Sequence, residues 1–296
     1  MQLSPKHFWP PRNFGAIDAE LAALETAQFV ILPVPYDSTT TWRGGTRDGA
    51  YAILDASMNM ELFDRELERE ICEVGIHTTD DIEPVMSSPR DMAGRIEEVV
   101  GEVLDMGKFP VMLGGEHSLT LGGVRALAKR SEHVTVVQID AHTDLRFEYG
   151  GTPFGHGCVM RRCSELDNVD IVQIGLRSVS REEWELKPEN VTQFWADDVL
   201  SDFSANLAGI LSYVQGDVYL TFDVDGCDPS WMPDTGTPEP GGFSFYQVRD
   251  LFRALCQKPD VRVRAFDCVE LIGGNAASAF AVSRLIYKVM GYLSGE

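Results

Sequence analysis

The residues best suited to chemistry lie in three short segments, of which the densest is Asp140-Ala-His142-Thr-Asp144. In extended chain, positions i, i+2 and i+4 project from the same side, so two carboxylates and an imidazole share one face. Such a face favours a divalent cation. The alternative is an exposed acidic turn with a capping aspartate, but three unpaired polar groups beside a buried strand would be costly. The segment therefore predicts a metal site.

A second carboxylate cluster, Asp223-Val-Asp225-Gly-Cys-Asp228-Pro, follows another apolar run. A calcium loop of the EF-hand type also begins with aspartates at this spacing, but it needs glycine at its sixth position and glutamate at its twelfth. Those positions hold Asp228 and Asp234, and no helix is expected before the loop, so the pattern excludes an EF-hand. Because Asp228 precedes proline, we expect it to hold a turn or cap a helix rather than bind a metal.

The third segment, Gly114-Gly-Glu-His117-Ser, adds an imidazole behind two glycines that permit close approach of the backbone. His117 alone would as readily be a hydrogen-bonded structural residue. Together the segments offer two histidines and four aspartates, more than one metal ion uses, whereas two ions share bridging carboxylates. Mixed nitrogen and oxygen ligands favour Mn²⁺ or a similar ion over a thiolate zinc site. Two such ions activate water for attack on carbon or phosphorus, so we expect a hydrolase.

Strands and helices that alternate along the chain must hold these segments. Apolar runs rich in β-branched residues predict strands at residues 29–33, 109–113, 134–139, 171–174, 218–222 and 261–266. Helical periodicity predicts helices at residues 92–105, 119–129, 205–214, 245–257 and 277–293. No repeat, low-complexity tract or linker divides the sequence. We therefore expect one α/β domain over residues 1–296, with a mostly parallel sheet between two helix layers.

Each polar segment follows the carboxyl end of a predicted strand, and a further acidic segment, Asp267-Cys-Val-Glu270, lies at the end of the last one. Open α/β sheets bind ligands in the crevice outside the carboxyl ends of their strands. We therefore expect the segments to converge on one site.

The charge balance biases the choice of partner. The chain has 46 acidic and 25 basic residues, a formal net charge of −21, which repels nucleic acid and anionic lipid and favours cationic metals and small cationic substrates. Six scattered cysteines without a CxxC pair are typical of reduced thiols. No secretory signal or run of about 20 apolar residues is apparent. We expect a cytoplasmic protein with no nucleic-acid or membrane partner.

With these residues in view, the chain resembles the ureohydrolase family of arginases and agmatinases. The family's three metal motifs occur in order as GGEHS, DAHTDLR and FDVDGCDP, and the resemblance covers essentially the whole chain. It implies a three-layer α/β/α fold, two Mn²⁺ ions and hydrolysis of a guanidino group to an amine and urea. Family members commonly form trimers or hexamers, so a homotrimer or homohexamer is expected by analogy.

The resemblance also implies how the ligands divide between the ions. His117 and Asp144 match ligands of one manganese. His142 and Asp225 match ligands of the other, and the bridging pair corresponds to the residues that begin two of the motifs, Asp140 and Asp223. Asp144 is also expected to hydrogen-bond the attacking oxygen and help pass its proton to the leaving amine.

Three residues outside the metal motifs match family positions that act on the substrate. His156 matches a histidine that shuttles protons or orients the substrate, a role suited to its ordinary pKa, although an exposed loop histidine is the alternative. Glu270 matches the glutamate that grips the guanidinium, since a planar cation is well held by a bidentate carboxylate. Thr237, in TGTPEPGG, either adds a hydrogen bond or belongs to a purely structural turn.

We expect the loop of residues 145–156, LRFEYGGTPFGH, to contact the end of the substrate opposite its guanidino group. Arginases have Asn and a Thr/Ser-rich stretch here, whereas this loop and the segment PYDSTTTWRGG resemble agmatinases, which favours agmatine, a dication. Arg146 either attracts a substrate carboxylate or forms a structural ion pair with Glu148 or Asp144, and we favour the structural ion pair. Guanidinobutyrate, guanidinopropionate and arginine remain alternative substrates.

Two other classes of protein stay open at this point. A deacetylase-like relative of the same fold usually carries one Zn²⁺ and lacks the full set of six ligands. A non-catalytic member of the family would normally have lost ligands, and none of the six matched positions is lost here. The sequence therefore favours an active ureohydrolase.

Overall fold

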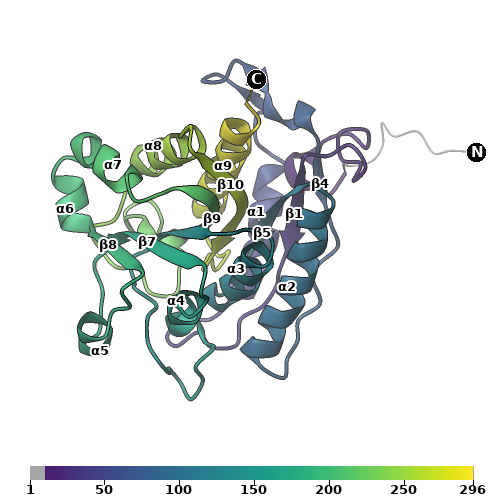
Figure 1. The fold of residues 1–296 in the computed structure, drawn as a ribbon. Coiled ribbons are helices and arrows are strands. Elements are labelled where there is room, and N and C mark those ends of the chain that lie inside the picture. Colours follow the sequence, from purple (N-terminus) through teal and green to yellow (C-terminus); the bar gives the residue numbers. More distant parts are fainter. Residues whose placement is uncertain (1–10, 296) are drawn as a thin grey trace, which may run out of the picture.

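The computed structural model describes residues 11–295 and shows eight strands in one sheet flanked by helices (Figure 1). The strands of this sheet are β1 (Phe29–Pro33), β4 (Ile76–Thr78), β5 (Phe109–Leu113), β6 (Val134–Ile139), β7 (Val169–Leu176), β8 (Val191–Trp195), β9 (Gly216–Asp223) and β10 (Val261–Val269). Every pair within the sheet is parallel, which confirms the expected α/β fold. A separate antiparallel hairpin joins β2 (Phe63–Asp64) and β3 (Arg69–Glu70).

Helices cover both faces of the sheet. They are α1 (Gly49–Ser57), α2 (Pro89–Asp105), α3 (Thr120–Ala128), α4 (Val159–Ser164), α5 (Arg181–Glu185), α6 (Ala196–Ser201), α7 (Phe203–Leu211), α8 (Phe245–Cys256) and α9 (Ala276–Leu293). Buried residues of α2, α3 and α4 form one apolar cluster, and those of α1, α8 and α9 belong to another. Alternate residues of β1 divide between the clusters, with Ile31 in one and Leu32 in the other, as the pleat of a strand requires. The three-layer arrangement is visible in Figure 1.

The order of the strands brings the polar segments together. Across the sheet the strands run β4-β1-β5-β10-β9-β6-β7-β8, so β10 and β9 lie between β5 and β6. Leu113, Cys268, Phe222 and Ile139 pair in one continuous row at the carboxyl ends of these four strands. The residues that follow this row begin or lead into the four polar segments. The strand ends that were expected to converge are therefore neighbours at one level of the sheet.

Two further findings concern the rest of the molecule. None of the helices within residues 11–295 has the length and apolar character needed to cross a membrane. All six cysteines are free, and five of them are buried.

Candidate metal centre and substrate pocket

The histidines and aspartates of the three motifs lie within reach of one another. His117 Nδ1 is 3.1 Å from Asp140 Oδ2, 3.0 Å from Asp144 Oδ2 and 3.4 Å from the nearest oxygen of Asp223. His142 Nδ1 is 2.9 Å from Asp225 Oδ2 and 3.6 Å from the other oxygen of Asp140. The structure thus brings all six predicted ligands to one place.

The six side chains form two groups that share one carboxylate. His117, Asp140 and Asp223 offer ligand atoms to one position, and Asp140, His142 and Asp225 offer them to another. Asp140 turns one oxygen toward each histidine, which is the geometry of a bridging ligand. Asp223 belongs to the first group only, and its Oδ1 accepts the amide of Asp225, so its bridging role stays a prediction.

A chain of hydrogen bonds can support the tautomer of His117 that a metal ligand needs. Thr120 Oγ1 donates to Asp267, so the hydroxyl of Thr221 is free to donate to Thr120 at 3.3 Å and to accept from His117 Nε2 at 2.9 Å. With the imidazole proton on Nε2, Nδ1 presents a lone pair to a cation. That nitrogen is fully buried and has no hydrogen-bond partner among the described residues, yet it faces three carboxylates.

These observations show that the residues fit a pair of divalent metal ions. A buried lone pair that points at carboxylate oxygens is repulsive unless a cation lies between them. The carboxylates also crowd one another. Burial, followed by repulsion from Asp140, raises the pKa of Asp144 to about 7, and burial with repulsion from Asp225 raises the pKa of Asp223 well above its usual range. Divalent cations would relieve this crowding.

Backbone geometry at the site is unusual at two residues. Asp144 has φ of 51° and Glu270 has φ of 66°, the left-handed region that residues other than glycine seldom occupy. Close packing explains the glycines of GGEHS, because a Cβ at Gly115 would lie 1.7 Å from the carbonyl oxygen of Tyr36. The Gly115 carbonyl in turn accepts the amide of Glu270. Local strain and close approach together aim the two acidic side chains.

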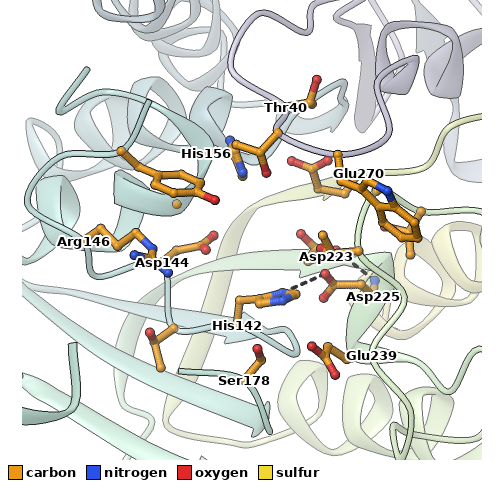
Figure 2. Close-up of a pocket in the computed structure, with 18 of the residues that line it drawn as sticks. Thr40, His142, Asp144, Arg146, His156, Ser178, Asp223, Asp225, Glu239 and Glu270 are labelled. Carbon is orange, nitrogen blue, oxygen red and sulfur yellow. Dashed lines mark hydrogen bonds and ion pairs between the residues drawn. The ribbon is translucent and has the colours of Figure 1, made fainter. Parts of the chain in front are cut away.

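A cavity of about 330 Å³ opens above the metal ligands. Its wall includes His142, Asp144, Asp223 and Asp225, and also the four residues predicted to act on substrate, Arg146, His156, Thr237 and Glu270. Figure 2 shows His156 and Glu270 on one side of this space, with the metal ligands below them. Thr237 is exposed, and no hydrogen bond of its side chain is present within the described chain, so its role also stays a prediction.

Glu270 is anchored and buried at the cavity wall. Its Oε1 accepts the backbone amide of His117 at 2.7 Å, which leaves Oε2 for a ligand. Burial raises the pKa of Glu270 to about 8 against the opposing effect of that hydrogen bond. A carboxylate that has lost its hydration in this way gains strongly from a cation that donates two hydrogen bonds.

His156 is held by two residues that the sequence did not single out, Thr39 and Glu116. The buried carboxylate of Glu116 accepts from the amides of Ser38 and Thr39 and from the hydroxyls of Thr39 and Ser118. The hydroxyl of Thr39 gives its only proton to Glu116, so at 3.1 Å it accepts from His156 Nδ1. The lone pair of His156 is therefore on Nε2. Burial lowers the pKa of His156, which keeps the ring neutral near pH 7.

Arg146 has a different partner from those we expected. Its Nε lies 3.9 Å from Glu183, and its guanidinium stacks 4.6 Å from the centre of the Tyr149 ring. Neither Glu148 nor Asp144 makes the predicted ion pair. The reason is tertiary, because Glu183 belongs to α5 and reaches the loop through hydrogen bonds from Thr143 Oγ1 and the amide of Leu145. Asp228 behaves as predicted, since it accepts the amides of Ser230 and Gly241 in a turn and lies in neither metal group.

Comparison with known proteins identifies the family. The model of the arginase family matches residues 27–291. The chain is 38% identical to an N(1)-aminopropylagmatine ureohydrolase of Synechocystis, over 98% of this chain and 96% of that protein. It is 34% identical to an agmatinase of Pyrococcus horikoshii, over 94% and 97% of the two chains. The crystal structure of agmatine ureohydrolase of Thermoplasma volcanium superimposes with a TM-score of 0.86 at 30% identity, over 97% and 96% of the two chains. The chain therefore belongs to the arginase family and is an agmatinase-like ureohydrolase.

Proposed function

We propose that this enzyme hydrolyses the guanidino group of agmatine to putrescine and urea, with two Mn²⁺ ions in the centre described above. The observation that carries the proposal is the position of Glu270, a buried carboxylate with one free oxygen on the wall of the cavity that the metal ligands line. A planar guanidinium bound there places its central carbon beside the metal ligands. The acidic lining of the cavity suits a dication.

The chain divides the chemistry among its residues. His117, Asp140, Asp144 and Asp223 would hold one ion, and His142, Asp225 and Asp140 the other. When bound, the two ions supply Lewis acidity that neutralises the crowded carboxylates and lowers the pKa of a water molecule. Glu270 orients the guanidinium for attack. Asp144 accepts a proton from the attacking water and passes it to the leaving amine, and His156 Nε2 exchanges protons at the mouth of the site.

A second candidate substrate is N(1)-aminopropylagmatine. Relatives that are 38% and 35% identical to this chain carry that activity in their names. The guanidino end of this compound is the same as that of agmatine, so the metal centre and Glu270 serve both, whereas the tail is longer and carries one more ammonium group.

Urea release from the Mn²⁺-loaded enzyme tests the proposal, with agmatine, N(1)-aminopropylagmatine, 4-guanidinobutyrate, 3-guanidinopropionate and arginine as substrates. We expect agmatine or its aminopropyl derivative to have the highest kcat/KM. We expect Glu270→Gln to lose at least about a hundredfold in kcat/KM, because the amide presents a donor to the guanidinium in place of a charged acceptor. Glu148→Gln, which removes an exposed charge outside the cavity, is the matched control. Arginine turnover ten times faster than that of agmatine would overturn the substrate assignment.

A further inference from the structure

We infer that Glu239 reads the ammonium group at the tail of the substrate and thereby selects cationic over anionic guanidino compounds, an inference that rests on the proposed function. Glu239 lines the same cavity as the metal ligands and Glu270, in the loop TGTPEPGG. It is half-buried, and among the described residues its carboxylate has no hydrogen-bond or ionic partner. Figure 2 shows this carboxylate directed toward the space between the labelled side chains.

The other acidic residues of the cavity wall are already engaged. Asp144, Asp223 and Asp225 face the two histidines of the metal groups, and Glu270 accepts the amide of His117. Glu183 is fully used, because its two oxygens accept four hydrogen bonds from Thr143, Leu145 and the amide and hydroxyl of Ser180. Glu239 is thus the acidic group of this wall that is left to meet a second positive charge.

Arg177 fixes the position of Glu239 relative to the metal centre. Its guanidinium donates to the carbonyl of Glu239 at 2.7 Å and to that of Pro240 at 3.0 Å. The same guanidinium donates to the carbonyl of the metal ligand Asp225 at 2.6 Å. One planar cation therefore ties the loop of Glu239 to the backbone of the metal site. The backbone of Glu239 is preorganised in this way, so only the side chain loses ordering entropy when the carboxylate pairs with an ammonium.

The other charged and aromatic residues that line the cavity also favour a cationic tail on the substrate. The guanidinium of Arg146 already forms an ion pair with Glu183 and stacks on the ring of Tyr149. Trp42 is 71% exposed and lines the cavity, so it offers an aromatic face to an ammonium. Arg43 also lines the cavity and is exposed, and it is the group that an anionic tail would use. A half-buried carboxylate on an anchored loop attracts an opposite charge more strongly than an exposed arginine, since exposed pairs contribute little.

Three guanidines that differ only in the tail test the inference. Agmatine ends in an ammonium, butylguanidine has a hydrogen in place of that ammonium, and 4-guanidinobutyrate ends in a carboxylate. We expect Glu239→Gln to raise KM for agmatine roughly tenfold or more with little change in kcat, because a hydrogen bond to a charged group is lost. KM for butylguanidine should stay the same. Glu239→Lys should reverse the preference and improve kcat/KM for 4-guanidinobutyrate.

The control variant is Glu148→Gln, which removes one exposed negative charge outside the cavity and should leave all three KM values unchanged. Calorimetric titration of the same ligands into the Mn²⁺-loaded variants gives the comparison independently of turnover. If wild-type enzyme hydrolyses none of the three compounds, the proposed function fails, and the calorimetric difference between agmatine and butylguanidine still decides the role of Glu239. An equal loss for agmatine and butylguanidine in Glu239→Gln, or no loss for either, would overturn the inference.

Discussion

The hydroxyl of Thr221 should control metal affinity although it touches no metal. It accepts from His117 Nε2 and so keeps the lone pair of Nδ1 directed at the carboxylates. Thr221→Val preserves the size and shape of the side chain and removes only the polar contact. In the metal-loaded state, His117 must then keep a proton on a buried nitrogen that has lost its acceptor. In the metal-free state the proton can move to Nδ1, where three carboxylates accept it, so the cost falls on metal binding.

The size of the effect follows from the burial of this contact. Thr221 and His117 are 0% and 1% exposed, so water cannot replace the lost acceptor. An unsatisfied buried donor costs about 1–3 kcal/mol, and about 1.4 kcal/mol corresponds to a tenfold change in a binding constant. We therefore expect Mn²⁺ affinity to fall roughly 10- to 100-fold, the range usual for groups that orient a metal-binding histidine.

Competition with a coloured chelator measures the Mn²⁺ dissociation constant of each variant. Thr135→Val is the matched control, because Thr135 is 1% exposed on the neighbouring strand β6 and its hydroxyl donates to the carbonyl of Gln215, away from the metal ligands. Both substitutions should lower Tm by similar amounts, but only Thr221→Val should weaken Mn²⁺ binding. Dissociation constants within twofold of wild type for Thr221→Val, or an equal loss in Thr135→Val, would refute the reasoning.

Three further results are expected. Because burial lowers the pKa of His156, its neutral form persists as pH falls, so the part of the acid limb of kcat/KM that is lost in His156→Asn should lie below pH 6.5; loss of a limb above pH 7 in that variant would contradict this. Thr39→Val should reduce kcat about tenfold or more by releasing His156, whereas Thr39→Ser keeps the hydroxyl and should restore most of the rate, as stopped-time urea assays can measure. Removal of metal with EDTA should lower the free energy of unfolding by about 4 kcal/mol for each ion lost, relative to enzyme at a thousandfold excess of Mn²⁺ over its Kd, and calorimetry that finds no change in Tm would contradict a metal centre that stabilises the fold.

The central strands could be predicted from the sequence because both faces of each are buried. β1, β5 and β6 begin and end at the predicted residues, since most of their side chains are apolar and all but that of Phe109 are buried. The two edge strands, β4 and β8, were missed. They are partly exposed, and β8 is buried at only one of its five residues, so neither has the continuous apolar run that signals a buried strand. Helix α1 was missed as well, because it begins with glycine after a glycine-rich loop.

The clustering of the histidines and aspartates could be predicted, but the residues that hold them could not. Asp140, His142 and Asp225 are recognisable from their spacing after a strand. Thr221 and Glu116 act through partners more than 75 residues away in sequence, and a single sequence gives no sign of such pairs. The ion-pair partner of Arg146 was predicted wrongly for the same reason. Sequence proximity suggested Glu148, whereas the capping box at the start of α5 delivers Glu183.

The order of strands in the sheet explains why four distant segments make one centre. In sequence, β6 is the next strand of the sheet after β5, and α3 connects the two. In the sheet they are not neighbours, because β10 and β9 lie between them. This arrangement separates the loop of His117 from that of Asp140 by the width of two strands, and the ends of those two strands supply Glu270 and Asp223. If β5 and β6 paired directly, the loops would close on each other and the acidic residues of β9 and β10 would lie outside the crevice. The insertion creates the switch point at which α/β sheets bind ligands, and it sets Glu270, the carboxylate proposed to bind the guanidinium, one strand away from the proposed metal ligands on either side.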